Sequence, residues 1–535
     1  MRQKPGVPMI VHGGRIWTGD EANPAAEAFF VEGGVFRAVG GLNDVEARAR
    51  ASCGHKIDVI DAGGALVMPG ISDAHIHLTA YCKNQLYTDL SAVSSIDELL
   101  GALKSHIEEH PEFHWVRAFG YNETLWPKPI QPTMDMIDSI ANGRAVIVSR
   151  YCGHAHVAGR IAMEESGLWN SRDANVVRGP DGLPTGVLNE EAPGPILSLV
   201  EREHETRERI KSLAVKGCGM LASMGVTAVH ACDAPLYGLP EDISIFQDMR
   251  DSGDLPIRVI TYADRLPGMS FRSGLGDRFV QYAGLKIFLD GSLGARTAAL
   301  RADFSDAPGN KGQLNHSDEE LFDLMYAAFS RDIQVQIHMI GDAATDQAIR
   351  VAKRVYERLG GRPRRPPRFN HVIVSPPEQL DDLVSLGVVI DIQPIQTYTD
   401  RFMAPSRLGP ERMRQTYQFR RFYDSGLIMT GSSDAPMENP NPWRGIWVAV
   451  CRTDSDGVPF KYSREDQALA LDEALTIYTR NPYRAIGWDG YGVIAEGASA
   501  DFAILGNNPF EDDAQKLKDV KVRATYLEGV KTYGG

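Results

Sequence analysis

Two histidines separated by one residue, His75 and His77, are the first residues in the sequence whose types and spacing could do chemistry. They lie in MPGISDAHIHL, whose apolar residues are typical of a buried strand. Side chains at positions i and i+2 of a strand point to the same face, so the two imidazoles can bind one metal ion together. By itself this motif is a weak signal, because two histidines can also share an exposed strand without any function.

Four further residues of ligand type lie at or near the ends of later apolar runs. They are Lys286 in GLKIFLDGS, His338 in IQVQIHMIGD, His371 in RFNHVIVS and Asp434 in LIMTGSSDAP. A buried polar side chain needs a partner, and each one alone has an ordinary explanation, such as a histidine bonded to a carbonyl or a lysine in an ion pair. Together with the histidine pair they point to one shared metal centre, and a ligand set rich in imidazole nitrogen suits Zn²⁺.

The elements that must position these residues alternate along the middle of the chain. Apolar runs of strand length recur at 71–78, 226–231, 257–262, 284–290, 333–338, 369–374, 388–393 and 428–434. Amphipathic stretches lie between most of them, and Ser317 with Glu320 forms a capping box, while Gly360 and Gly387 follow two of the helices. Eight strand–helix repeats predict an α/β fold, a (β/α)8 TIM barrel whose strand ends share one face.

Both ends of the chain read as short β-strands. The pairs Gly13-Gly14 and Gly33-Gly34 each separate two runs rich in β-branched residues, which predicts hairpins, and Glu528-Gly529 predicts another. We therefore expect a small β-sandwich built from residues 1–66 and 488–535, with the barrel at 67–487.

A long interval separates the first predicted barrel strand from the second. It exceeds what one strand–helix unit needs, so residues 85–205 are predicted to form an insertion with strands of its own. Connections that follow barrel strands lie on the face that carries active sites, so the insertion is expected to act as a lid or substrate pocket. Tyr121, Trp115 and Trp126 are candidates for an apolar pocket wall or for core packing.

Composition excludes several classes of function. With 43% hydrophobic and 24% charged residues, wholesale disorder is excluded. The formal net charge of −14 argues against nucleic acid or an anionic membrane as the main partner. No apolar run approaches the ~18 residues of a membrane span, and the N-terminus has no apolar core typical of a secretory signal. The six cysteines are scattered without a CxxC pair, which favours a reducing, cytoplasmic location.

Several motifs resemble those of a known enzyme family. They are, in chain order, PGISDAHIHL, LKIFLDGSLGARTAAL, IHMIGDAATDQAI, RFNH, GSSDAP and ASADFAILGNNPF. This combination resembles the amidohydrolase superfamily, and within it the YtcJ-like group, amidohydrolase family 3, which includes N-substituted formamide deformylase. The resemblance runs from about residue 10 to the C-terminus and does not specify the substrate.

The resemblance implies a role for each candidate ligand. His75 and His77 would bind one metal ion, and His338 and His371 a second. Lys286 would bridge the ions as an N6-carboxylated lysine, because a free lysine, with a pKa of about 10.4, is a cation, whereas a carbamate is an anion with two oxygens. Asp434 would bind the first ion and act as the catalytic proton shuttle. Whether one or two Zn²⁺ ions bind per subunit stays open.

The resemblance also implies an activity on a small molecule. The expected reaction is hydrolysis of a C–N bond of amide, formamide or N-acyl type by attack of a metal-bound hydroxide. The alternatives are a deaminase or a lactone, ester or carbamate hydrolase of the same superfamily, and Lys286 counts against a deaminase, which commonly lacks the bridging lysine. A non-catalytic scaffold is a remote alternative that the complete ligand set opposes. Dimers are frequent among relatives, so a homodimer is compatible with the resemblance.

Four residues are candidates for substrate binding. His154 lies in RYCGHAHVAG and Glu190 in TGVLNEEA, where the group has similar patterns; Arg296 follows DGSLGA, and Tyr121 is the pocket candidate named above. For each charged candidate the alternative is a surface charge or a structural ion pair. His230 ends the second predicted strand and is expected to support the centre or to pack.

Overall fold

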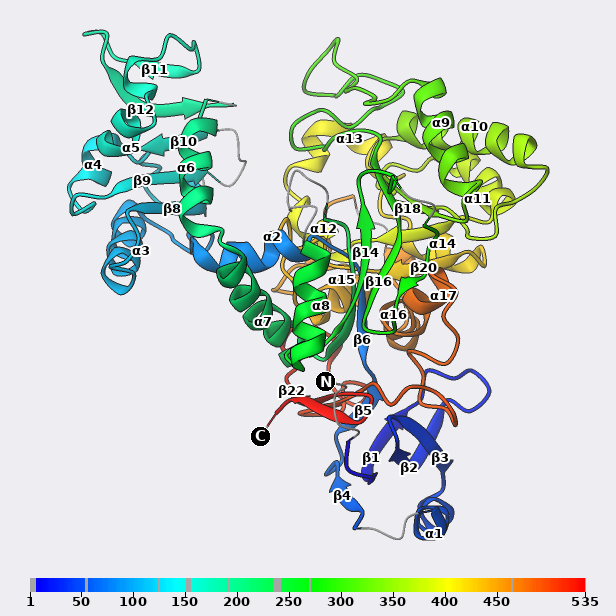
Figure 1. Ribbon diagram of the computed structural model, residues 1–535. Helices are drawn as coiled ribbons and strands as arrows, with labels where there is room; N and C mark the ends of the chain where they lie inside the picture. The colour runs from blue at the N-terminus through cyan, green and yellow to red at the C-terminus, as the bar shows by residue number, and fades with distance from the viewer. Residues whose placement is uncertain are drawn as a thin grey trace. The chain divides into compact units, whose positions relative to one another are not determined.

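The computed structural model describes residues 6–52, 56–123, 126–150, 155–190, 192–233, 242–268, 271–462 and 465–534. The chain divides into two compact units. One unit is Tyr81–Gly217, called here the 81–217 unit, and the other, the main unit, combines Met1–Ala80 with Cys218–Gly535. The colour ramp of Figure 1 runs from blue through cyan to green across the 81–217 unit.

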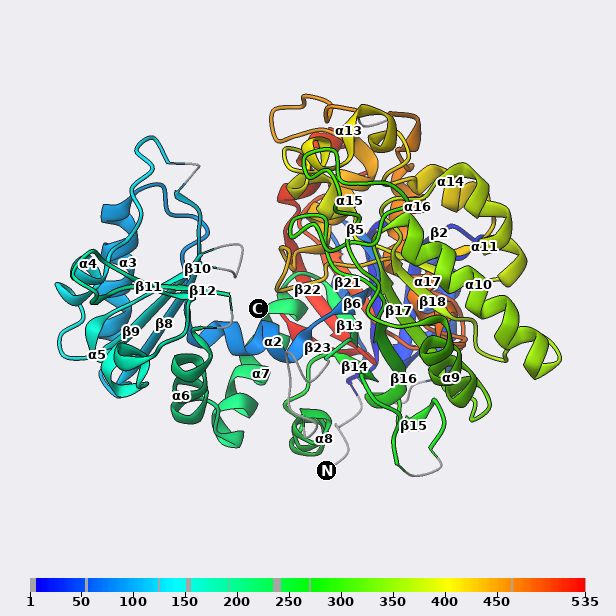
Figure 2. The same ribbon diagram turned by 90° about the horizontal axis from the view of Figure 1, so that it is seen from above.

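The main unit contains eight parallel strands that form a nearly closed barrel (Figure 1 and Figure 2). In sheet order they are β6 (Ile71–Ile76), β13 (Val226–Ala231), β14 (Arg258–Ala263), β16 (Val280–Phe288), β17 (Gln334–Met339), β18 (Arg368–His371), β19 (Val389–Ile392) and β20 (Ile428–Gly431), and the short β15 (Leu275–Gly276) pairs with β16. Each strand overlaps one of the eight apolar runs, so the predicted (β/α)8 barrel is confirmed.

The first and last barrel strands meet through the segments that follow them. The His77 amide donates to the Ala435 carbonyl at 2.8 Å, and the Asp434 amide donates to the His75 carbonyl at 2.8 Å. The buried Asp73 carboxylate accepts from the amides of His75 and Ser433 at the same seam. Closure of the barrel therefore places two candidate ligands from distant parts of the chain beside each other.

Helices lie between and after the barrel strands. They are α7 (Arg207–Ser223), α8 (Asp242–Ser252), α9 (Asp318–Phe329), α10 (Asp342–Leu359), α11 (Leu380–Leu386), α12 (Pro394–Thr399), α13 (Ala404–Met413), α14 (Phe419–Asp424), α15 (Pro442–Cys451), α16 (Leu471–Tyr478) and α17 (Arg480–Ala485). The capping box of Ser317 and Glu320 opens α9, and Gly360 and Gly387 end α10 and α11 in the left-handed conformation that glycine tolerates. These three predictions are confirmed, and the three helices lie side by side in Figure 2.

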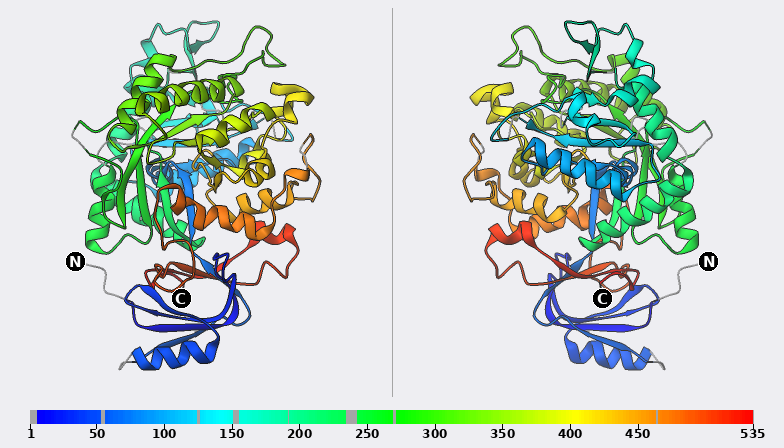
Figure 3. Two further views of the ribbon diagram at one scale, coloured as in Figure 1. Left: turned by 90° about the vertical axis from the view of Figure 1, so that its right-hand side faces the viewer. Right: turned by 90° about the vertical axis from the view of Figure 1, so that its left-hand side faces the viewer.

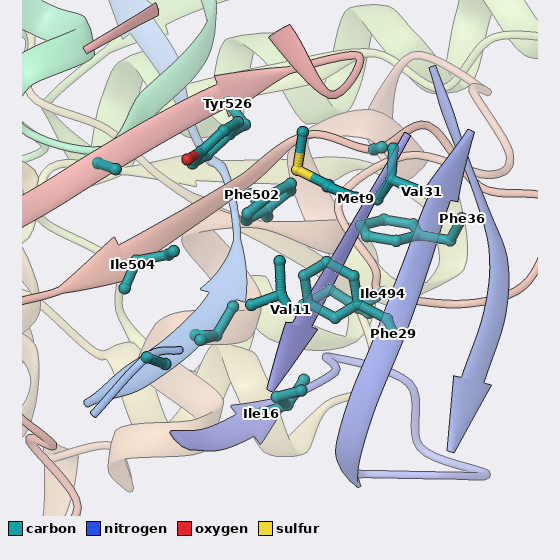
Figure 4. Packing of buried hydrophobic residues seen from close by; sticks show 14 of the residues in the cluster. Met9, Val11, Ile16, Phe29, Val31, Phe36, Ile494, Phe502, Ile504 and Tyr526 are labelled. Carbon is teal, nitrogen blue, oxygen red and sulfur yellow. The ribbon is translucent and has the colours of Figure 1, made fainter. Parts of the chain in front are cut away.

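Strands from both ends of the chain pair in one sheet of the main unit, and Figure 3 shows the blue and red ends side by side. Its strands are β1 (Met9–Trp17), β2 (Ala25–Glu32), β3 (Val35–Gly40), β4 (Asp58–Asp61), β5 (Leu66–Pro69), β21 (Phe502–Leu505), β22 (Val522–Leu527) and β23 (Val530–Tyr533), with α1 (Leu42–Ser52) after β3. Phe29 packs edge-on against Phe502 with ring centroids 5.0 Å apart, and Phe502 stacks on Tyr526 at 4.4 Å (Figure 4). The two-layered sandwich stays a prediction.

One of the predicted hairpins is wrong. Gly33-Gly34 and Glu528-Gly529 have positive φ and connect antiparallel strands, as expected. Gly13 and Gly14 instead lie inside the single strand β1, where the pairing register shifts. There β1 changes parallel partner from β4 to β5, and a Cβ on Gly13 would lie 2.0 Å from an Asp61 oxygen. The glycines are required for a bulge and a close approach rather than for a turn.

A buried ion pair joins the barrel to the C-terminal strands. Arg258 of β14 is fully buried, and its guanidinium donates to both Asp501 carboxylate oxygens at 3.0 and 3.1 Å. It also contacts Glu528 at 3.1 Å. Because both charges are removed from water, either partner alone would be left in an unfavourable environment.

Replacing Arg258 with Met is expected to lower the free energy of unfolding by about 3–5 kcal/mol, since the Asp501 carboxylate would stay buried and unpaired. Urea denaturation followed by circular dichroism measures the change. Arg50→Met is the matched control, because Arg50 forms an exposed ion pair with Glu46 within α1 and the change should alter stability little. Equal midpoints for the two variants would contradict the structural role of Arg258.

The 81–217 unit has a sheet and a core of its own. Its strands, in sheet order, are β11 (Val176–Arg178), β12 (Pro184–Asn189), β10 (Ala155–Ala158), β9 (Ala145–Arg150), β8 (Trp115–Tyr121) and β7 (Thr88–Asp89). Its helices are α3 (Ile96–Glu109), α4 (Met134–Asp138), α5 (Arg160–Glu165) and α6 (Gly194–His204), while α2 (Leu78–Lys83) crosses its first boundary. The core contains Leu99 and Leu103 of α3 together with Tyr121 and Trp126. None of the helices in the described ranges is long and apolar enough to cross a membrane.

Candidate metal centre

Three ligand-type side chains meet at the seam between the first and last barrel strands. His75 lies near the end of β6, His77 follows that strand, and Asp434 follows β20. The Asp434 Oδ1 atom lies 3.4 Å from His75 Nε2 and 3.3 Å from His77 Nε2. All three side chains are buried, and one ligand atom from each lies within 4.8 Å of the others. Such a cluster has the donor types that bind a divalent cation.

The remaining three candidates approach from the middle strands of the barrel. Lys286 Nζ of β16 lies 3.3 Å from His75 Nε2. The rings of His75 and His371 have centroids 5.2 Å apart, and those of His371 and His338 lie 4.4 Å apart. The structure therefore brings together all six side chains that the sequence analysis singled out.

The backbone near the centre departs from ordinary strand geometry. His371 has φ of 69° and Val372 has φ of 45°, and Asp434 has φ of 62°. Non-glycine residues rarely adopt this left-handed region, and such strain is concentrated at functional sites. In a regular strand Asn370 and His371 would face opposite sides. The altered backbone at His371 explains how both neighbours reach the polar groups at this end of the barrel.

Burial sets the protonation states of the candidate ligands. Burial lowers the pKa of His75 and of His338 well below the ordinary value, and it lowers the pKa of His371 to about 4. Burial alone would raise the pKa of Asp434, but a hydrogen bond from His77 and the nearby positive groups bring it below its usual value. Neutral imidazoles and a carboxylate are the forms that bind metal ions.

The donor atoms provide a test of fit. The Nε2 atoms of His75 and His77 lie 3.4 and 3.3 Å from Asp434 Oδ1, and all three side chains are buried. Two imidazole nitrogens and a carboxylate oxygen this close together form a donor set that binds divalent cations. The residues present therefore fit a metal ion.

His338 is oriented by two groups in the segment that follows β16. Its Nε2 atom lies 3.1 Å from the Gly291 carbonyl oxygen and 3.6 Å from Asp290 Oδ1. Asp290 is itself fixed by the amides of Ala299, Ile340 and Gly341. A neutral imidazole that donates from Nε2 keeps its lone pair on Nδ1, so these contacts select the tautomer of His338.

Sequence reasoning missed a polar network in the barrel interior. Asn370 Oδ1 accepts from Lys286 Nζ at 2.5 Å, and Asn370 Nδ2 donates to Asp391 at 2.6 Å. Asp391 pairs with Arg368, and both side chains are fully buried. The available signal was the alternation of polar and apolar residues in RFNH, which places Arg368 and Asn370 on one face of a buried strand.

The predicted substrate-binding residues have the following places. Glu190 follows β12 and is exposed. Arg296 lies in the segment after β16, and its Nε and Nη2 atoms contact Asp306 at 3.0 and 2.9 Å, which is the ion pair considered as its alternative. Tyr121 is fully buried in the core of the 81–217 unit. His154 lies outside the described residues, and substrate binding by these residues stays a prediction.

His230 contacts a charged neighbour. Its Nδ1 atom lies 2.6 Å from Arg368 Nη1, and burial lowers the pKa of the imidazole well below the ordinary value. A neutral Nδ1 can accept a hydrogen bond from the guanidinium. This contact fits the supporting role expected from the sequence.

Comparisons with known proteins agree with this architecture. A model of the amidohydrolase family matches residues 58–533. YtcJ of Bacillus subtilis (strain 168) is 29% identical over 98% of this chain and 99% of its own length. The N-substituted formamide deformylase of Arthrobacter pascens is 24% identical over 98% of both chains.

A solved structure shows the same fold over most of the chain. The metal-dependent hydrolase from Pyrococcus horikoshii OT3 has a TM-score of 0.79 and 26% identity, and the match covers 95% of this chain and 99% of that chain. The family model spans nearly the whole sequence and includes every candidate ligand. The protein belongs to the amidohydrolase family.

Proposed function

We propose that the protein is a metal-dependent hydrolase that cleaves a C–N bond of amide, formamide or N-acyl type in a small molecule. The observation that carries this proposal is the convergence of six ligand-type side chains, five buried and His338 partly buried, at one end of the barrel. Its relatives include an N-substituted formamide deformylase and a metal-dependent hydrolase, which supports a reaction of this class.

Each side chain has a proposed role in holding the metal. His75, His77 and Asp434 would hold one ion, and His338 and His371 would hold a second, with Lys286 between them. The nitrogen-rich donor set favours Zn²⁺. When bound, a divalent ion supplies Lewis acidity, which polarises a carbonyl group and makes water a better nucleophile.

Lys286 would serve as a carbamate. Its Nζ lone pair attacks the carbon of CO₂, a C–N bond forms, one C–O π pair moves to oxygen, and one N–H proton leaves to solvent. The product is an anion with two oxygens, which can contact two cations, whereas an ammonium group repels them. The position of Nζ beside His75 Nε2, 3.3 Å away, supports this role.

Asp434 would move the proton during hydrolysis. Its carboxylate takes the proton from the attacking water and gives it to the departing nitrogen, which otherwise leaves poorly as an amide anion. Gln396 Nε2 donates to Asp434 Oδ2 at 3.1 Å, so one oxygen is held by the amide while the other faces the two histidines.

Zinc is expected to stabilise the folded protein. A ligand that binds only the native state adds about 2.7 kcal/mol at a free concentration 100 times its Kd, so thermal unfolding of chelator-treated protein should shift upward when Zn²⁺ is returned. His75→Ala should lose this shift, and His114→Ala, a partly exposed histidine paired with Glu165, should keep it. An equal shift in all three proteins would contradict the assignment of His75.

A substrate panel tests the reaction class. The zinc-loaded protein is incubated with N-formyl amines, N-acyl amines, carbamates, lactones and amino-heterocycles, and the products are identified by mass spectrometry. Release of an amine and a carboxylic acid is the expected result. Turnover of lactones alone would reject C–N cleavage, release of ammonia from a heterocycle would indicate a deaminase, and absence of both zinc and turnover would indicate a scaffold.

Three further expectations stay predictions. They are the lid or pocket role of the insertion at 85–205, the homodimer and the cytoplasmic location. The boundaries of the predicted domains, 1–66 with 488–535 and 67–487, also stay predictions.

A further inference from the structure

Asn370 is a buried amide that joins Lys286 to an ion pair deep in the barrel. It is fully buried on β18. Its Oδ1 accepts from Lys286 Nζ at 2.5 Å, and its Nδ2 donates to Asp391 Oδ2 at 2.6 Å. None of the proposed catalytic roles uses this side chain.

The orientation of the Asn370 amide follows from its neighbours. Asp391 receives the Arg368 guanidinium through both oxygens, at 3.0 Å each. A carboxylate paired in this way only accepts hydrogen bonds. The NH₂ group of Asn370 must therefore face Asp391, which turns its carbonyl oxygen toward Lys286.

Arg368 also connects this network to the other side of the centre. Its Nη2 atom donates to the Ala74 carbonyl at 2.9 Å, next to His75 in β6. Gln336 Nε2 and the Thr430 hydroxyl donate to the Asp391 carboxylate. Groups from three barrel strands, β17, β18 and β20, thus hold the carboxylate that orients Asn370.

We propose that Asn370 is a positioning residue that fixes Nζ of Lys286 for metal binding. The inference rests on the proposed function, because it assumes that Lys286 serves the metal centre. Both the neutral amine and the carbamate of Lys286 carry an N–H bond, so the Asn370 oxygen can accept from either form. Because Asn370 Oδ1 accepts one N–H of Lys286, Nζ is held in place on the side of Asn370. The opposite side of Nζ can then face His75 and the other proposed metal-binding groups.

The test compares zinc affinity in Asn370→Leu and in the unaltered protein. Leu has a similar volume but no acceptor, and loss of a group that orients a ligand lowers metal affinity by about 10–100-fold. Competition dialysis against a chelator of known affinity measures this fall without any substrate. The visible absorption of the Co²⁺-loaded protein should also change, because it reports the ligand geometry.

Two further variants separate positioning from general stability. Gln379→Leu removes an equally buried amide that contacts Asp342 and Asp346 away from the centre; it should keep wild-type zinc affinity and cobalt absorption. Asn370→Ser is made in parallel, so that the test does not depend on the folding of the Leu variant. The short serine side chain cannot contact both Lys286 and Asp391. This variant is expected to show the same loss of affinity.

The outcomes distinguish this inference from the proposed function. Unaltered zinc affinity and cobalt absorption in a folded Asn370 variant would overturn the positioning role alone. An equal fall in Gln379→Leu would also overturn it, since the effect would then be one of general stability. Absence of zinc binding by the unaltered protein would overturn the proposed function and this inference together.

Discussion

Asp434→Asn is expected to lower kcat by about 10²–10⁴-fold, the usual contribution of a general acid–base group. Asn has the same size and can keep one oxygen near His75 Nε2 and His77 Nε2, where Asp434 Oδ1 lies 3.4 and 3.3 Å away. Its amide cannot take up and return a proton at neutral pH. The fold should be retained, and KM should change much less than kcat.

Steady-state kinetics on the best substrate of the panel measures this effect, with zinc content determined on the same sample. Asp342→Asn is the matched control, because Asp342 is a buried carboxylate that accepts from the Arg301 amide and has no part in the proposed chemistry. Unchanged turnover of Asp434→Asn at full metal content would reject the proton shuttle.

Lys286→Ala is expected to remove bound metal and to abolish activity. The loss of affinity should exceed the about 10–100-fold that accompanies loss of an orienting group, because the proposed ligand itself is removed. The variant also leaves Asn370 Oδ1 without its donor, and a buried unsatisfied group costs about 1–3 kcal/mol. Some loss of stability is therefore expected together with the loss of metal.

Metal analysis of the dialysed protein and turnover of the same sample measure the result. Lys286→Met separates the ligand effect from packing, since it fills most of the volume and should lose metal equally. Lys353→Ala, which alters an exposed lysine paired with Asp382, should change neither quantity. Two bound ions and full turnover in Lys286→Ala would refute the bridging role.

Much of the barrel was predictable because its signals are local. Each strand is a short apolar run, and its partner helices carry their own start and stop residues, such as Ser317 and Gly360. Parallel strands in a barrel present their carboxyl ends on one face. His75, Lys286, His338 and His371 could therefore be grouped from their positions in the runs.

The errors and omissions have physical causes of a different kind. Gly13-Gly14 has the composition of a hairpin turn, but its place is decided by the approach of Asp61 and by the partners of β1. Arg368 and Asp391 look like isolated charges in apolar strands, and only the pairing of β18 with β19 shows that each neutralises the other. A pairing between distant residues leaves no trace in either segment alone.

The amino-acid sequence by itself determined the order of the strands, the helix ends and the residues that could bind a metal, since these depend on side-chain type and on spacing along the chain. Tertiary structure alone decided that His371 turns into the site beside Asn370 through a left-handed backbone, and that Asp391 orients the amide facing Lys286. Backbone strain and buried hydrogen bonds depend on neighbours that become adjacent only when the barrel closes, and no local pattern encodes them.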